Sequence, residues 1–295
     1  MKIVSKKIDA VRDKLFEPLP CLPSGFSHLD NLVGGCPLGQ VIIVGGRASL
    51  GKSSLCIDLA LNAASYDSPV LFLTVEMSAV TVFRRMLSSV GLVPLKHFGK
   101  TDETENGRLA DAEGIIGEYK ILVDDDTDLT PSKIIQKIDE FSTQVDRPFL
   151  TVVDYLDLIQ PDTRTQSRAY ELEEIMKVLQ REIKQRNTCL VVASQLNREV
   201  EKRENPWPRL SDLRSSGAIE QSADMVWLLF REDYYKLADG DIAQELTGEA
   251  KLIVAKNRHG PVGVVDLAFI PEICSFRNVE GESLKLWNVG SPPPF

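Results

Sequence analysis

The chain has 295 residues, of which 43% are hydrophobic and 26% charged, and its formal net charge is -9 at pH 7. These values are typical of a globular protein with one large α/β domain or two small ones, and the negative charge argues against a general nucleic-acid coat. No apolar run is long enough for a membrane span or a signal peptide, and the five dispersed cysteines lack C-x-x-C spacing. We therefore predict a cytoplasmic protein without a membrane segment, a zinc site or a disulfide framework.

The first 20 residues are predicted to form a linker helix that leads into the folded domain. Ile8, Val11 and Leu15 have helical spacing with charged residues between them, and two prolines end the segment. Such an amphipathic helix packs either on its own domain or on a neighbouring subunit. We expect the main domain to span residues 21–280 and residues 281–295 to form a poorly packed tail.

The most specific motif is a phosphate-binding loop at residues 46–53. Its sequence, GRASLGKS, fits G-x-x-x-x-G-K-[ST] and lies between an apolar strand and a predicted helix over residues 53–64. Terminal glycines let backbone N–H groups approach phosphates, the lysine places its charge on the β- and γ-phosphates, and the serine hydroxyl ligates Mg²⁺. We predict ATP and Mg²⁺ as cofactors, with ATP held by Gly46, Ser49, Gly51, Lys52, Ser53 and Ser54.

Apolar runs alternate with amphipathic segments along most of the chain. The clearest helix is predicted over residues 169–185, where the apolar side chains form one stripe. This alternation predicts an α/β fold of the P-loop NTPase kind, with a largely parallel central sheet and helices on both faces. The last runs lack helices between them, so we expect an antiparallel edge. The predicted strands are Val41–Val44, Val70–Val75, Ile121–Val123, Phe149–Val153, Leu190–Ala193, Val226–Phe230, Leu252–Ala255 and Val264–Phe269.

Three of these strands end in polar residues, at the sheet edge where ligands of open α/β folds bind. Asp154 is predicted to hold Mg²⁺ together with Ser53. Glu76 either deprotonates the water that attacks the γ-phosphate or is a solvated acid in the first turn of the next helix. Gln195 either senses the γ-phosphate or is an ordinary strand-end amide, and the residues alone leave both choices open.

A basic loop follows the strand that ends at Gln195. Its cations surround Trp207, and this composition suits phosphates and a stacked base, whereas the interleaved glutamates equally fit a solvated charged loop. Farther along, Lys256 and Arg258 form a second basic turn. They either reach the nucleotide of a neighbouring subunit, with Arg258 as an arginine finger, or belong to an ordinary surface turn. The cations of the first loop are Arg198, Lys202, Arg203, Arg209 and Arg214.

Together these segments resemble the bacterial and phage replicative DNA helicases of the DnaB type, within the RecA-like ATPases. The resemblance covers residues 25–278 in the order of that family. It is carried by GFSHLD (25–30) with the following Gly34-Gly35, the phosphate loop, VEMS (75–78), VDYLDLI (153–159), SQLNR (194–198), LSDLRSSGAIEQ (210–221) and AKNRHGP (255–261).

The resemblance implies a RecA-like homo-hexameric ring with a nucleotide at each subunit interface. Within the phosphate site it implies Glu76 as the catalytic base and Gln195 as the γ-phosphate sensor, beside Lys52 and Asp154. It implies that Lys256 and Arg258 act on the adjacent subunit's nucleotide. Primase or a helicase loader are the protein partners it suggests. Single-stranded DNA is the other implied partner, and the candidate contacts are Arg198, Lys202, Arg203, Arg214 and Gly217.

Two departures from the family pattern matter. Ser215 stands where the family usually has an acidic residue after the arginine of the DNA loop. Full-length members carry an N-terminal helical domain for which nothing before Gly25 has room, so we expect an isolated motor domain or a naturally short form.

We predict an ATP-dependent replicative helicase motor that translocates on single-stranded DNA and unwinds duplex DNA. One alternative is a RecA-like ATPase for strand exchange, signalling or helicase loading without unwinding. A second alternative is a non-enzymatic accessory ring subunit or loader, against which the intact set of Lys52, Glu76 and Asp154 argues.

Overall fold

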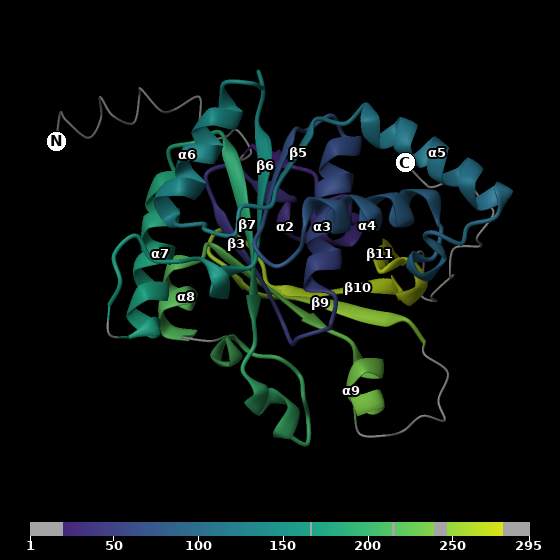
Figure 1. Ribbon diagram of the computed structural model, residues 1–295. Coiled ribbons are helices and arrows are strands. Elements are labelled where there is room, and N and C mark those ends of the chain that lie inside the picture. Colours follow the sequence, from purple (N-terminus) through teal and green to yellow (C-terminus); the bar gives the residue numbers. More distant parts are fainter. Residues whose placement is uncertain (1–19, 166, 214–215, 239–246, 280–295) are drawn as a thin grey trace.

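A computed structural model describes residues 20–165, 167–213, 216–238 and 247–279 of the chain (Figure 1). The predicted linker helix and tail, and Arg214 with Ser215, lie outside these residues. The strands are β1 (Cys21–Leu22), β2 (Cys36–Pro37), β3 (Val41–Gly46), β4 (Val70–Thr74), β5 (Ile121–Asp124), β6 (Phe149–Asp154), β7 (Thr188–Gln195), β8 (Met225–Phe230), β9 (Glu249–Asn257), β10 (Gly263–Ile270) and β11 (Ser275–Asn278).

The α-helices are α2 (Ser27–Val33), α3 (Lys52–Ser65), α4 (Ala79–Gly91), α5 (Glu103–Gly117), α6 (Pro131–Ser142), α7 (Arg168–Ile183), α8 (Ser216–Ser222) and α9 (Glu232–Ala238). Short 3₁₀ turns connect several elements. They are η2 (Leu95–His97), η3 (Leu156–Leu158), η4 (Arg198–Lys202), η5 (Leu210–Asp212) and η6 (Pro271–Ile273). Among the described residues, no helix combines the length and apolar character needed to cross a bilayer.

A nine-stranded sheet organises the described part of the chain, in the order β11-β10-β9-β8-β3-β7-β6-β4-β5. The strands from β8 to β5 are parallel to their neighbours, whereas β9, β10 and β11 form an antiparallel edge. The predicted α/β architecture and its antiparallel edge are therefore confirmed. Because β3, β4, β6 and β7 run in one direction, their carboxyl ends meet at one edge of the sheet.

The sheet is buried on both faces, which explains why its strands are continuous apolar runs. Along β3, Ile42 and Val44 join the core that contains α3, whereas Val41 and Ile43 join the core that contains α6 and α7. Figure 1 shows the corresponding layers, with α6, α7 and α8 on one side of the sheet and α3, α4 and α5 on the other. Two of the cysteines, Cys56 and Cys189, are fully buried in the core that contains α3.

The predicted helices over residues 53–64 and 169–185 correspond to α3 and α7, and each predicted strand corresponds to an observed one. The sequence interpretation did not include β11, the short antiparallel β1–β2 pair or α9. The four-residue segment of β11, Ser-Phe-Arg-Asn, lacks the apolar run by which the other strands were found.

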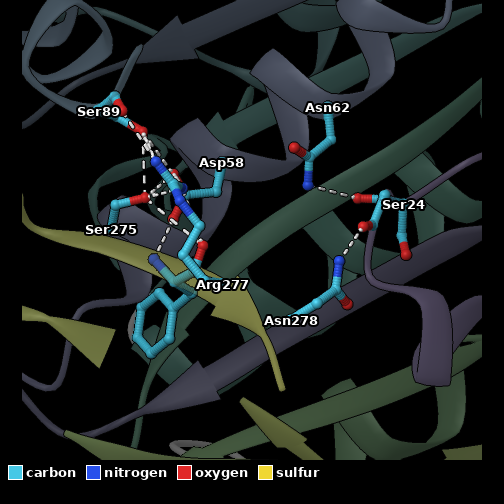
Figure 2. Close-up of polar contacts among 9 residues, drawn as sticks. Ser24, Asp58, Asn62, Ser89, Ser275, Arg277 and Asn278 are labelled. Carbon is cyan, nitrogen blue, oxygen red and sulfur yellow. Dashed lines mark hydrogen bonds and ion pairs between the residues drawn. The ribbon is translucent and has the colours of Figure 1, made fainter. Parts of the chain in front are cut away.

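A buried polar network fastens β11 to α3, the helix that follows the phosphate loop (Figure 2). The carboxylate of Asp58 accepts hydrogen bonds from the Ser275 hydroxyl at 2.7 Å, the Phe276 N–H at 2.6 Å and the Ser89 hydroxyl at 3.3 Å. Nη1 of Arg277 lies 3.6 Å from the same carboxylate. Burial outweighs these contacts and raises the pKa of Asp58 to about 6.

Amide side chains tie the beginning of the described chain to its end in the same region. Asn62 of α3 donates to the Ser24 carbonyl at 3.0 Å, and Asn278 of β11 donates to the Gly25 carbonyl at 2.8 Å (Figure 2). The phosphate-loop helix therefore contacts both ends of the described chain through Ser24 and β11.

Candidate ATP site at the carboxyl edge of the sheet

The phosphate loop connects the end of β3 to the start of α3. Ser49 and Gly51 have positive φ values of 62° and 105°, so the backbone turns sharply before α3 begins at Lys52. A side chain at Gly51 would also approach the Phe276 ring to 3.0 Å. The Lys52 ammonium donates to the Arg47 carbonyl at 2.9 Å, and burial lowers the pKa of Lys52 against the opposing charges of Asp154 and Glu76.

Asp154 lies at the end of β6 and is only 1% exposed. Among the described residues, no donor meets the geometric criteria for a hydrogen bond to either carboxylate oxygen of Asp154. Burial raises the pKa of Asp154, and the nearby Ser53 hydroxyl opposes that shift. A buried carboxylate without a hydrogen-bonded partner is costly, and a carboxylate beside a hydroxyl is the oxygen donor set that suits Mg²⁺. These residues therefore fit the predicted metal.

A pocket of about 410 Å³ opens above the phosphate loop and brings several predicted residues together. Glu76, which follows β4, is exposed and lines this pocket, so its carboxylate is accessible to water and ligand. Gln195 stands opposite Gly46 in the pairing of β7 with β3, which places it level with the start of the loop. The lining residues predicted from the sequence are Ser49, Gly51, Lys52, Ser53, Ser54, Glu76 and Gln195.

The pocket also contains residues that sequence reasoning missed. Arg85 comes from α4, whereas Phe269 and Cys274 come from the antiparallel edge of the sheet. The remaining additions are Ala48, Met77 and Tyr155. Only Ala48 and Tyr155 carried a sequence signal, because Ala48 lies within the phosphate loop and Tyr155 directly follows the proposed metal-binding aspartate.

Lys256 and Arg258 lie at the end of the sheet opposite to the phosphate loop. In the antiparallel pairing of β8 with β9, Asn257 faces Met225, the first residue of β8, and Met225 in turn pairs with Ile42 near the start of β3. The two cations therefore stand at the amino end of the parallel strands, whereas the phosphate loop stands at the carboxyl end. This placement separates Arg258 from the phosphate loop of its own chain.

Polar groups near α8 hold both cations. The Lys256 ammonium donates to the Ala223 carbonyl at 2.7 Å and to the Glu220 carbonyl, and burial lowers its pKa. Arg258 donates to the Gln221 carbonyl at 2.6 Å and to the buried Asp224 carboxylate at 3.2 Å. This carboxylate fixes the local fold as well, because it accepts a hydrogen bond from the Val41 N–H at 3.0 Å.

The basic loop after β7 lies at the carboxyl edge, below the sheet in Figure 1, beside α9. Arg198 is exposed, and Lys202 is exposed while paired with Glu199 at 2.7 Å. Arg203 is half-buried and forms an ion pair with the buried Asp212.

Two other residues of the predicted DNA surface have different surroundings. Gly217 is exposed near the start of α8, with no atom within 4 Å of a side chain built there. The ring of Trp207 packs on Phe230 with centroids 5.1 Å apart and lies at the edge of the core that contains α6 and α7. Packing in this loop thus accounts for Trp207 without a stacked base.

Comparisons with known proteins agree with this geometry. The chain is 39% identical over 251 residues to the replicative DNA helicase DnaB of Leifsonia xyli, a match that covers 84% of this chain and 54% of that protein. The chain thus spans about half the length of this curated relative. Its fold also resembles a solved structure whose title describes an ATPase domain, with a TM-score of 0.85 and 29% identity, covering 94% of this chain and 99% of that one.

A second solved structure is titled "The Structure Of A DnaB-Like Replicative Helicase And Its Interactions With Primase". It matches with a TM-score of 0.84 and 28% identity, covering 95% of this chain and 67% of that chain. The family model described as the DnaB-like helicase C terminal domain matches residues 21–278, which include the phosphate loop, Asp154 and both basic segments. The chain therefore belongs to the family of DnaB-like helicase C-terminal domains.

Proposed function

We propose that this chain is the ATP-hydrolysing motor of a replicative DNA helicase. The observation that carries the proposal is the buried Asp154 carboxylate, for which no hydrogen-bond partner is found among the described residues and which lies near Ser53, a residue that lines the pocket. A buried carboxylate without a partner destabilises the fold, so a purely structural role does not explain Asp154. Binding of Mg²⁺ with ATP does explain it. The relatives named as replicative DNA helicases support the same activity.

The protein groups divide the reaction between them. Lys52 and the N–H groups at the start of α3 bind the phosphates, and Ser53 and Asp154 hold Mg²⁺, which neutralises phosphate charge when bound. Glu76 orients and deprotonates the attacking water. Gln195, on the neighbouring strand, contacts the γ-phosphate or the attacking water and passes the change to the loop that follows it.

We propose that Lys256 and Arg258 act in trans, in a homo-hexameric ring in the cytoplasm. Their position at the amino end of the parallel strands supports this role, because the phosphate loop of the same chain lies at the carboxyl end. An arginine from the next subunit would stabilise the charge that develops on the transferred phosphoryl group. Each nucleotide site is then completed by two subunits.

The proposed DNA surface is the segment that follows Gln195. Arg198 and the open backbone at Gly217 suit a phosphate chain, and so does Lys202, because its pair with Glu199 is exposed and weak. Arg203, by contrast, is paired with the buried Asp212. Arg214 remains a candidate outside the described residues. Hydrolysis would shift this segment and move one strand, which unwinds the duplex, and primase or a loader is the proposed protein partner.

ATP turnover with and without single-stranded DNA, together with the mass of the assembly, tests this function. We expect ATP turnover, stimulation by DNA, a six-subunit mass and unwinding of a forked duplex. Glu76→Gln should bind ATP normally and lose about 10²–10⁴ in turnover, the contribution typical of a general base. ATP turnover without translocation or fork unwinding would favour the alternative of a RecA-like strand-exchange or loading ATPase. Turnover unaffected by Glu76→Gln would remove Glu76 as the base.

A further inference from the structure

Arg47 is the second residue of the phosphate loop, yet its side chain points away from the phosphates. It is only 4% exposed and does not line the nucleotide pocket. Its Nε donates to the Glu201 carboxylate at 2.6 Å, and its Nη1 donates to the Leu196 carbonyl at 2.7 Å. Both partners lie in the segment directly after Gln195, so the loop is bound to that segment through one guanidinium.

The backbone at Arg47 and at the preceding Gly46 also makes hydrogen bonds. Its carbonyl accepts the Lys52 ammonium at 2.9 Å, and the preceding Gly46 carbonyl accepts the Leu196 N–H at 3.1 Å. The Lys52 ammonium has two further N–H donors for phosphates, so the group that is proposed to bind nucleotide is hydrogen-bonded directly to the Arg47 backbone. The conformation around Arg47 is therefore placed to respond to nucleotide.

Glu201 belongs to η4, the short turn that carries the exposed cations Arg198 and Lys202. A neighbouring acid of the same turn, Glu199, is 64% exposed in its side chain and pairs only with Lys202 among the described residues. The two acids therefore carry the same charge on the same turn, but only Glu201 reaches the phosphate loop. Farther on, Trp207 packs on Phe230, so the indole lies where its environment depends on the position of the loop that η4 begins.

We propose that the Arg47–Glu201 pair couples phosphate binding at the loop to the position of η4, which makes Arg47 a positioning residue for the response to single-stranded DNA. The inference deepens the proposed function and rests on it for the identity of the ligand. A charge-assisted contact with a buried guanidinium is directional and short, so it transmits a displacement better than the exposed Glu199–Lys202 pair. The pair thus joins the hydrolysis site to the DNA surface within one subunit.

The first test compares Glu201→Gln with Glu199→Gln in the full chain. We expect basal ATP turnover to remain unchanged in both variants, and stimulation by single-stranded DNA to fall about fivefold or more only in Glu201→Gln, the lower end of typical coupling between sites. Equal stimulation in the two variants would overturn the proposal, because each removes one negative charge from η4. Melting temperatures distinguish a general loss of folding from lost coupling.

A double-mutant cycle separates coupling from independent effects. Stimulation should fall to the same level in Arg47→Met, in Glu201→Gln and in the double variant, since the Arg47–Glu201 ion pair is absent from all three. Losses that multiply in the double variant would show that the two side chains act separately and would contradict the proposal.

A measurement without DNA keeps this inference distinguishable from the helicase function. Trp207 lies in the loop that η4 begins, so its fluorescence should change when a non-hydrolysable ATP analogue binds the wild-type chain and Glu199→Gln. A Trp207→Phe variant assigns the signal. The change should be lost in Glu201→Gln, and its persistence there would overturn the coupling whether or not the chain unwinds DNA.

Discussion

Two buried aspartates, Asp58 and Asp154, differ in the number of hydrogen bonds that the fold gives to their carboxylates. Both are almost fully buried, and burial raises the pKa of both. Asp58 accepts three hydrogen bonds and lies near Arg277, whereas Asp154 has no complete hydrogen bond among the described residues. The fold supplies hydrogen-bond donors to the first carboxylate, whereas the second is the one that we propose to bind a ligand.

The location of the two groups follows from the topology. Asp58 lies in α3, connects the phosphate-loop helix to β11 and does not line the nucleotide pocket. Asp154 lies at the carboxyl end of β6, the edge at which parallel strands of α/β proteins present ligand-binding groups. The same residue type therefore braces the scaffold in one place and supplies the proposed metal ligand in the other.

Removing the charge at Asp154 should give the largest effect. We expect Asp154→Asn to lower ATP turnover about 10³-fold, or about 4 kcal/mol in the activation free energy, because a preorganised electrostatic group of the site is lost. The melting temperature without nucleotide should stay equal or rise, since an unpaired buried charge is removed. Turnover and thermal unfolding of one preparation provide the check, and a marked loss of stability with retained turnover would reverse the assignment.

Removing the charge at Asp58 should give the opposite pattern. Asp58→Ala is expected to lower the free energy of unfolding by about 3–5 kcal/mol, because Arg277 and the surrounding donors lose their buried acceptor. Urea unfolding measures this loss. ATP turnover per folded molecule should change little in Asp58→Ala. The control Leu61→Ala, elsewhere on α3, measures the stability lost when only apolar packing is removed. A stability equal to wild type in Asp58→Ala would show that the network does not support the fold.

The pH dependence of stability gives a smaller effect of defined sign. The pKa of Asp58 is about 6 in the folded chain and 3.8 ordinarily, so the folded state binds the proton more tightly. Its contribution to stability is fully present below pH 3.8 and is lost as the pH rises through 6, by at most about 3 kcal/mol. Unfolding free energies of wild type and Asp58→Asn at about pH 4 and about pH 7 test this, and a difference that does not change with pH would contradict it.

Local motifs predicted the phosphate loop and the polar residues at the ends of the parallel strands. The sequence predicted the phosphate loop with its flanking strand and helix. It also predicted the strand ends at Glu76, Asp154 and Gln195, because buried parallel strands are apolar runs that end in polar groups. Their convergence follows from strand direction alone. The residues left open in the sequence, such as Glu76, needed the fold to show that they face the pocket.

Contacts between distant segments were not predictable from those patterns. β11 has no apolar run of its own and is held by Asp58, which lies 217 residues earlier in the chain than Ser275. Phe269 and Cys274 reach the pocket from the antiparallel edge, which no phosphate-binding motif marks. The environment of Trp207 also required the fold, because only Phe230 from β8 shows that the indole is used in packing.

Metal binding tests the central assignment most directly. Mn²⁺ is a spectroscopic substitute for Mg²⁺, and its electron paramagnetic resonance signal measures free ion during titration of the wild-type chain in the presence of ADP. We expect one nucleotide-dependent Mn²⁺ per chain in wild type and in Asp58→Asn, and a strong loss of affinity in Asp154→Asn. Equal Mn²⁺ affinity in wild type and Asp154→Asn would contradict the account.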